Sequence, residues 1–278
     1  MKLCIRPHDI GKDMSADELG EKIGALGFDG VQLAIAKAIR GNDGSPEALT
    51  PDAVREIRAG FNSHGVEIPV LGAYFNPVHS NKEKVRQGSR KFADHLKKAR
   101  DFGATLVASE TGSYNDDKWT YNPKNQTDEA FNEVVSVFAP LAQAAREAGE
   151  LLSAEGAWHH CIYSPEQMAR FLREIDTGAV RVTVDVLNYL YIGNYEQRRS
   201  IFDKCLELFL DKIAIFHIKD FVVQDGKLVE VGIGKGIMGW DTFLPEIKKN
   251  VPNAILVFEG VKDLDESLAY FRTLMETL

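Results

Sequence analysis

The chain has 278 residues, of which 44% are hydrophobic and 27% are charged, and these values are ordinary for a soluble globular enzyme. Its formal net charge of −8 argues against a nucleic-acid backbone as the main partner, because such binding depends on clustered Lys and Arg. No apolar run is long enough for a membrane span, and the N-terminus MKLCIRPHDI has no apolar core of a signal peptide. Three cysteines without CxxC spacing favour reduced thiols and a cytoplasmic protein.

Strand-like and helix-like segments alternate along the whole chain. The first strand is predicted at Lys2–Arg6, and the helix after it begins with the capping box Ser15–Glu18 and ends at Gly27. Further strands are predicted at 30–35, 67–74, 105–109, 151–155, 180–185, 212–220 and 254–259. Further helices are predicted at 51–64, 81–102 and 127–149, from Ser164, at 196–210, and from Asp241 and Asp263.

Eight strand-then-helix units predict the α/β class and a closed parallel (β/α)8 TIM barrel. The alternative is an open, doubly wound sheet. The sequence contains no low-complexity stretch and no Pro- or Ser-rich linker, so we expect a single domain over residues 1–278.

Four consecutive predicted strands end in a residue that can bind a metal ion. LLSAE ends at Glu155, VRVTVD ends at Asp185, KIAIFHIKD contains His217 near its end, and AILVFE ends at Glu259. Their spacings of 30, 32 and 42 residues correspond to about one βα unit each, with a Gly-rich insertion in the last. Because the carboxyl ends of barrel strands meet at one rim, the sequence predicts a shared metal site there.

Two Glu, one Asp and one His provide three hard oxygen donors and one imidazole. This donor set suits Mn²⁺ or Mg²⁺ best, and Zn²⁺ or Co²⁺ remains open. A divalent ion held there would polarise a substrate carbonyl and stabilise an enediolate. Glu155 and Glu259 come from separate strands, so they could flank the substrate as the acid–base pair of an isomerase or epimerase.

These motifs resemble the xylose isomerase-like TIM-barrel superfamily, the sugar phosphate isomerase/epimerase and AP endonuclease family 2 group. The matching segments are LLSAEG, VDVLN, FHIKD, VFEG and the loop GIGKGIMGW at 232–240. The resemblance implies that Glu155, Asp185, His217 and Glu259 bind the metal ion and that the two glutamates also transfer protons.

The sequence departs from the group in places. Ketose 3-epimerases carry a second Glu after the first ligand, where this chain reads GAWHHCIYS, and an Arg beyond the metal histidine, where it reads FVVQ. Asn188 stands where those epimerases have a histidine, and we take it as a substrate-binding candidate. None of the seven histidines follows His217, so the trinuclear zinc cluster of the AP endonucleases is not expected.

Other residues near the predicted rim are substrate-binding candidates, each with a plainer interpretation. His8 follows the first strand and could face the substrate or the solvent. Glu110 ends the fourth strand and could contact a sugar hydroxyl or a metal ligand. Trp158 could stack on a sugar face, whereas His159 and His160 are expected to be exposed loop residues. Lys219 could stabilise an oxyanion or pair with Asp220 or another acid.

Two loops allow functional interpretations as well. The polar loop 113–126 could be a substrate lid or a solvated excursion. The GIGKG loop could bind a phosphate through its glycines, but it follows the seventh strand, so a dinucleotide site is not expected.

We therefore expect a divalent-metal-dependent isomerase or epimerase of carbohydrate metabolism that acts on a sugar or sugar phosphate. The alternatives are a metal-dependent lyase of the inosose dehydratase type and a non-catalytic sugar-binding barrel. The partner is a small sugar or polyol-derived molecule, with no nucleic acid and no membrane, and the sequence leaves a homo-oligomer open.

Overall fold

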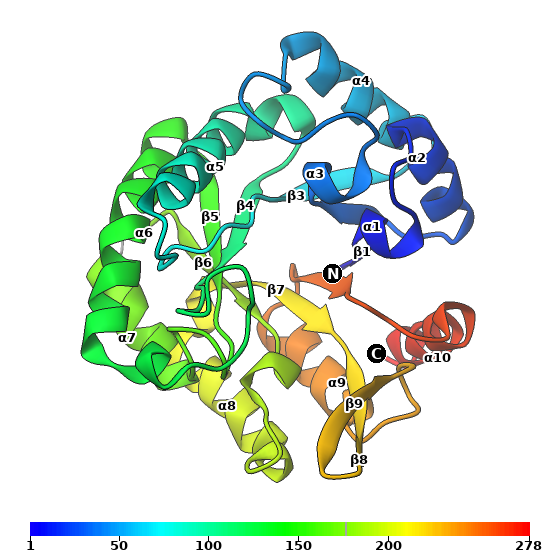
Figure 1. Cartoon of the computed structure of the whole chain (residues 1–278). Helices are drawn as coiled ribbons and strands as arrows, with labels where there is room; N and C mark the ends of the chain where they lie inside the picture. The colour runs from blue at the N-terminus through cyan, green and yellow to red at the C-terminus, as the bar shows by residue number, and fades with distance from the viewer. Residues whose placement is uncertain (176) are drawn as a thin grey trace.

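Eight parallel strands close into a barrel in the computed structural model, which describes residues 1–175 and 177–278 (Figure 1). The barrel strands are β1 (Lys2–Ile5), β2 (Gly30–Leu33), β3 (Glu67–Gly72), β4 (Leu106–Glu110), β5 (Leu151–Glu155), β6 (Val180–Val184), β7 (Ile213–Ile218) and β10 (Ile255–Phe258). Their order around the barrel is β1-β10-β7-β6-β5-β4-β3-β2, and pairing of Lys2 with Ile255 closes the ring. The predicted (β/α)8 TIM barrel is confirmed, and the open sheet is excluded.

A ring of helices surrounds the strands (Figure 1). The long helices are α2 (Ala16–Ala25), α4 (Pro51–Asn62), α5 (Lys82–Phe102), α6 (Asp128–Ala148), α7 (Pro165–Ile175), α8 (Arg198–Phe209), α9 (Trp240–Asn250) and α10 (Leu264–Glu276). Two short helices, α1 (Pro7–Ile10) and α3 (Ile35–Ala38), follow β1 and β2 and were not predicted. Within the described residues, no helix is both long and apolar enough to cross a bilayer.

The predicted helix starts are mostly confirmed by their caps. Ser15 forms the full capping box of α2, and the Thr50 and Thr127 side chains accept hydrogen bonds from the backbone N–H groups of Ala53 and Ala130 in the first turns of α4 and α6. The predicted cap of α10 is wrong. Asp263 adopts a left-handed conformation and makes no cap hydrogen bond, because its carboxylate pairs with Lys235 instead.

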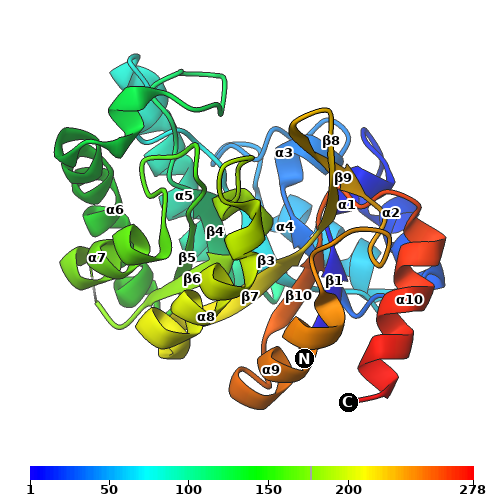
Figure 2. The same cartoon turned by 90° about the horizontal axis from the view of Figure 1, so that it is seen from below.

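A two-stranded hairpin extends from the carboxyl end of the barrel. It consists of β8 (Asp220–Gln224) and β9 (Lys227–Val231), which pair antiparallel. In Figure 2 the hairpin stands at the top, on the side opposite the two chain termini. No hairpin was predicted between the seventh strand and the helix from Asp241, and this one lies beside the barrel mouth.

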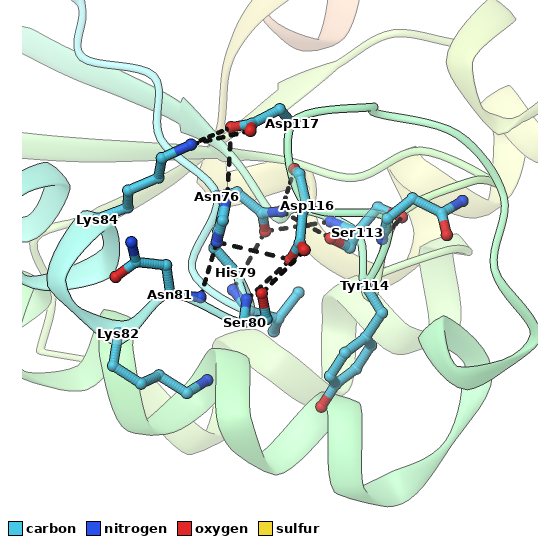
Figure 3. A network of polar contacts seen from close by, with 12 residues as sticks. Asn76, His79, Ser80, Asn81, Lys82, Lys84, Ser113, Tyr114, Asp116 and Asp117 are labelled. Atoms are coloured by element: carbon cyan, nitrogen blue, oxygen red, sulfur yellow. Dashed lines mark hydrogen bonds and ion pairs between the residues drawn. The ribbon is translucent and has the colours of Figure 1, made fainter.

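The loop 113–126 is fastened to the loop that follows β3. Asp116 accepts hydrogen bonds from the Ser80 backbone N–H and hydroxyl at 2.8 Å each, and Asp117 pairs with Lys84 at 2.7 Å. His79 lies between these two carboxylates, and the side chains of both loops converge in Figure 3. These contacts hold the loop against its neighbour at the rim of the barrel.

Candidate metal centre

Every second side chain of each barrel strand points into the barrel interior, and the last of these lie at the mouth. A small apolar cluster fills the interior, formed by Cys4, Val70, Leu106, Ala108, Ile215, Ile255 and Val257. Since side chains alternate along a strand, the next inward residue after Ala108 is Glu110, after Ile215 it is His217, and after Val257 it is Glu259. The strand alternation therefore places polar side chains directly above an apolar plug.

Glu155, Asp185, His217 and Glu259 converge on one point, as the sequence predicted. Each offers a ligand atom, and these atoms all lie within 4.8 Å of one another. His217 Nδ1 lies 3.4 Å from Glu155 Oε1, 3.6 Å from Asp185 Oδ2 and 2.7 Å from Glu259 Oε2.

Two of these ligand atoms are buried and are suited to bind a cation. Asp185 and His217 are 0% and 2% exposed. Asp185 Oδ2 and His217 Nδ1 make no hydrogen bond of good geometry among the described residues, and they contact the Lys219 ammonium and the Glu259 carboxylate as ion pairs. A divalent ion would give both atoms a ligand role. Three carboxylates and one imidazole match the donor preferences of Mn²⁺ and Mg²⁺.

Gln32 orients the histidine from the far side of the barrel. Its Oε1 lies 3.1 Å from His217 Nε2, and its amide group also contacts the Tyr74 hydroxyl. Because a carbonyl oxygen can only accept, Nε2 carries the hydrogen and Nδ1 faces the carboxylates. Burial alone would lower the pKa of His217, but Glu155 and Glu259 raise it well above its usual value. A cation and a proton therefore compete for Nδ1.

Lys219 and Arg6 provide positive charge beside the cluster. Lys219 Nζ lies 2.9 Å from Asp185 Oδ2 and 2.7 Å from Glu259 Oε1, and Arg6 lies 2.9 Å from the same Glu259 oxygen. Burial raises the pKa of Glu259, yet Lys219, His217 and Arg6 together hold it well below its usual range. Lys219 pairs with these carboxylates and not with Asp220.

Asn188 links two of the candidate ligands. Its Nδ2 donates to Glu155 Oε1 at 2.7 Å, and its backbone N–H donates to Asp185 Oδ1 at 3.0 Å. Its Oδ1 accepts from Lys219 Nζ at 3.3 Å. Asn188 therefore orients Glu155 and Asp185 at the edge of the site.

Glu110 lies one strand away from the cluster, and His160 lies behind it. His160 Nε2 is 3.4 Å from Glu110 Oε2. Burial and the charges of Glu155 and Glu259 raise the pKa of Glu110 to about 8. His160 is 0% exposed, so the expectation that this histidine would be an exposed loop residue is wrong.

His8 lies at the rim, in α1. It is 9% exposed, and burial and the neighbouring Arg6 charge lower its pKa to about 4. It is therefore a neutral imidazole at neutral pH, and its substrate contact stays a prediction.

Trp158 is the middle ring of a three-ring stack. Its ring centroid lies 4.6 Å from that of Tyr121 and 4.4 Å from that of Tyr191, both nearly parallel. These partners come from the loops after β4 and β6, so the stack ties three rim loops together. Both faces of the indole are covered here, and a direct sugar contact of Trp158 stays a prediction.

The GIGKG loop is organised by Asp220. Asp220 Oδ2 accepts from the N–H groups of Gly234 and Gly236, and Oδ1 accepts from those of Phe221 and Met238, at 2.9 to 3.1 Å. A Cβ at Gly236 would lie 2.1 Å from Asp220 Oδ1, so this position requires glycine. These amides are already used, which leaves them unable to cradle a phosphate.

Arg6, Gln32 and His160 were missed as site residues. Arg6 closes the first predicted strand as the four ligands close theirs, so the same strand-end rule would have found it. Gln32 is the one polar side chain within GVQLAI, which is a weaker signal.

A family model described as xylose isomerase-like TIM barrel matches residues 21–274. The chain belongs to the xylose isomerase-like TIM barrel family. No curated protein matches the sequence.

Several solved structures share this family fold. A D-tagatose 3-epimerase-like protein aligns with a TM-score of 0.77 and 17% identity, over 100% of this chain and 98% of the other. A xylose isomerase-like TIM barrel protein from Mycobacterium smegmatis, in complex with magnesium, gives 0.75 and 16%, over 100% and 96%. The probable 3-DHS dehydratase AsbF from Bacillus anthracis gives 0.73 and 14%, over 99% of each chain. At these identities the likeness establishes the fold alone.

Proposed function

We propose that the protein is a divalent-metal-dependent isomerase or epimerase of a sugar or a related polyhydroxy carbonyl compound. The observation that carries this proposal is the convergence of Glu155, Asp185, His217 and Glu259 at the barrel mouth, where their ligand atoms lie within 4.8 Å of one another. Similarity to a D-tagatose 3-epimerase-like protein and to a magnesium-bound family member supports it. Mn²⁺ or Mg²⁺ is the proposed ion.

The four ligands would hold the ion, and when bound it would polarise the substrate carbonyl and stabilise the enediolate. Glu259 is kept ionised by Lys219 and Arg6, so it is present as the carboxylate that takes a proton from carbon and later releases it to solvent. Glu155 is held by Asn188 on the other side of His217, and after taking up a proton from solvent it can deliver that proton to the enediolate. Two carboxylates on separate strands thus provide the base and the acid.

The substrate-facing residues follow from the same geometry. Lys219 is an ammonium 2.7 Å from Glu259 Oε1, in position to bind a developing oxyanion. Asn188, His8, Glu110 and Trp158 are proposed to contact or enclose the rest of the substrate from the surrounding rim.

A dehydratase is the second candidate. Burial and neighbouring carboxylates raise the pKa of Glu110 to about 8, so it keeps a proton at neutral pH that a departing hydroxide would need. The similarity to a probable 3-DHS dehydratase is consistent with this chemistry.

We also propose a cytoplasmic location. Cys4, Cys161 and Cys205 are all free and buried, which suits a reducing compartment.

A screen in deuterium oxide tests these proposals. The Mn²⁺-loaded protein is incubated with ketoses, aldoses and inososes, and the products are identified by NMR and mass spectrometry. Deuterium entering at carbon without loss of water supports the isomerase or epimerase, and loss of water supports the dehydratase. Tight sugar binding without exchange or product would instead indicate a binding protein and contradict both.

A further inference from the structure

Glu110 occupies an inward position level with a metal ligand but outside the ligand cluster. In the β4–β5 pairing, Glu110 is the direct partner of Glu155. Paired residues on adjacent parallel strands point to the same side of the sheet, so both carboxyl groups face the barrel mouth. The four clustered ligand residues do not include Glu110. Its carboxyl group is therefore free to contact something other than the ion.

His160 supports Glu110 from behind. The imidazole is 1% exposed, and its Nε2 lies 3.4 Å from Glu110 Oε2. Neither ring nitrogen of His160 has a hydrogen-bond partner among the described residues. Trp119 packs edge-on against the ring at 5.3 Å, which fixes its orientation. A buried imidazole without hydrogen bonds calls for an explanation, and a closer approach of Glu110 when a ligand is bound would give Nε2 a partner.

The segment that carries His160 is anchored to the end of β4. The backbone N–H of Cys161 donates to Gly112 O at 2.9 Å, and the His160 N–H donates to Ala157 O at 2.8 Å. The spacing between His160 and Glu110 is therefore set by backbone contacts. Glu110 keeps 28% of its side chain exposed, so it remains open to the mouth.

We propose that Glu110, held by His160, is a substrate-positioning residue that binds a hydroxyl group on the carbon chain beyond the two oxygens next to the ion. This inference rests on the proposed function and narrows its substrate class. Neighbouring strands lie about 4.8 Å apart, so a carboxyl group on β4 reaches a part of the substrate that glycolaldehyde lacks, because both of its oxygens would lie next to the ion. The substrate is therefore a longer polyhydroxylated chain or ring.

The charges around Glu110 further specify the substrate. Glu155 faces it from the neighbouring strand β5, Glu259 acts on it from the end of β10, and the cations near it are Lys37 and Lys219. Lys219 is already paired with Asp185 and Glu259. A phosphate beside Glu110 would meet another carboxyl group and a lysine that is already paired, and the amides of the loop after β9 are used by Asp220. The proposed substrate is therefore unphosphorylated.

Binding to the Mn²⁺-loaded protein tests the inference without a known reaction. The probes are D-fructose, D-psicose, D-tagatose, D-sorbose, D-fructose 6-phosphate and glycolaldehyde, and the measurement is Mn²⁺-induced relaxation of the ligand protons. Glu110→Ala should weaken the tightest ketohexose about 10-fold and leave glycolaldehyde unchanged. Glu110→Gln should restore most of the affinity, because a carboxamide can still donate to and accept from a hydroxyl.

Two further variants separate positioning from general structural damage. Glu150→Ala makes the same change at the opposite end of β5, beside Arg100, and should bind every probe as the wild type does. His160→Phe keeps an aromatic side chain at this position but removes both ring nitrogens. It should weaken the ketohexose as Glu110→Ala does, with no further loss in the double variant.

Each outcome has a defined meaning. A ketohexose affinity unchanged by Glu110→Ala, or tighter binding of the 6-phosphate than of D-fructose, would overturn this inference and leave the proposed function standing. Binding of glycolaldehyde with no binding of a ketohexose would also overturn the inference and leave the proposed function standing. A wild-type protein that binds Mn²⁺ but none of these probes, and none of the aldoses and inososes of the screen, would overturn the proposed function together with the inference.

Discussion

His217 and Gln32 meet across the barrel, with His217 Nε2 3.1 Å from Gln32 Oε1. His217 lies on β7 and Gln32 on β2, and strands β10 and β1 lie between these two in the sheet. The contact fixes which histidine nitrogen faces the carboxylates. A residue from the half of the barrel without candidate metal ligands therefore orients a histidine in the half that has them.

Gln32→Leu should weaken Mn²⁺ binding about 10- to 100-fold, because the imidazole loses the partner that orients it. Gln32→Glu is the matched control, since its carboxylate still accepts from Nε2 and should keep most of the affinity. Isothermal titration with Mn²⁺ measures both, with circular dichroism to verify folding. Equal Mn²⁺ affinity of the Leu variant and the wild type would contradict the role given to Gln32.

Saturating Mn²⁺ should raise the thermal unfolding midpoint of the wild type, and a chelator should reverse the effect. An ion at about 100 times its Kd contributes about 2.7 kcal/mol to the free energy of unfolding. Asp185→Asn removes a buried ligand and should lose most of this response. Asp211→Asn, at a side chain that is 81% exposed, should keep it. A thermal unfolding midpoint of the wild type that does not change with Mn²⁺ would rule out the candidate metal site.

Glu155→Gln and Glu259→Gln should each lower kcat for the substrate found in the screen by about 10²- to 10⁴-fold, because the carboxamide cannot take up or release the proton. Glu150→Gln, at the other end of the barrel, should leave kcat unchanged. Single-turnover proton exchange checks the chemical step directly. Retained exchange in either variant would remove that glutamate from the acid–base pair.

Asp220→Asn should lower the free energy of unfolding by about 3 kcal/mol, because an amide group would face two of the four backbone N–H groups that the carboxylate now accepts. Urea denaturation measures the loss, and trypsin cleavage after Lys235 should become faster. Asp225→Asn, in the hairpin turn at φ +49°, is the control, since Asn tolerates this conformation. Similar effects of both variants would contradict the role of Asp220.

His95 should make the protein less stable in mild acid. It is 0% exposed in α5, and burial lowers its pKa to about 4. The unfolded chain takes up this proton near pH 6.5, so stability falls as the pH drops from about 6.5 toward 4. His95→Leu should reduce the stability lost between pH 7.5 and pH 5 by about 2 kcal/mol, measured by urea denaturation. Parallel pH profiles of the two proteins would show that His95 does not contribute.

The sequence was sufficient for the barrel and its four candidate ligands because both follow from local patterns. Each ligand closes or nearly closes an apolar run, as Glu155 and Glu259 do, and strand ends of a parallel barrel must meet at one rim. Contacts between residues far apart in the sequence could not be predicted from such local patterns. The burial of His160 depends on Trp119 and Glu110, which reach it from the preceding βα unit.

The sequence also contains a local signal for the hairpin after β7. Asp225-Gly226 lies between two alternating segments, and both residues adopt positive φ, as a tight hairpin turn requires. The cap of α10 failed for the opposite reason. Its sequence signal was present, but the tertiary ion pair of Asp263 with Lys235 replaced the local hydrogen bond.

Closure of the barrel also determines when the protein can mature. β1 leaves the ribosome first, yet one of its two neighbours is β10, the last barrel strand to be synthesised. Glu259 follows that strand directly, so the candidate metal site is incomplete until late in translation. The proposed divalent ion would therefore gain its fourth ligand only after the last strand has been synthesised. Until then the nascent sheet has unsealed edges, which makes truncated chains prone to aggregation.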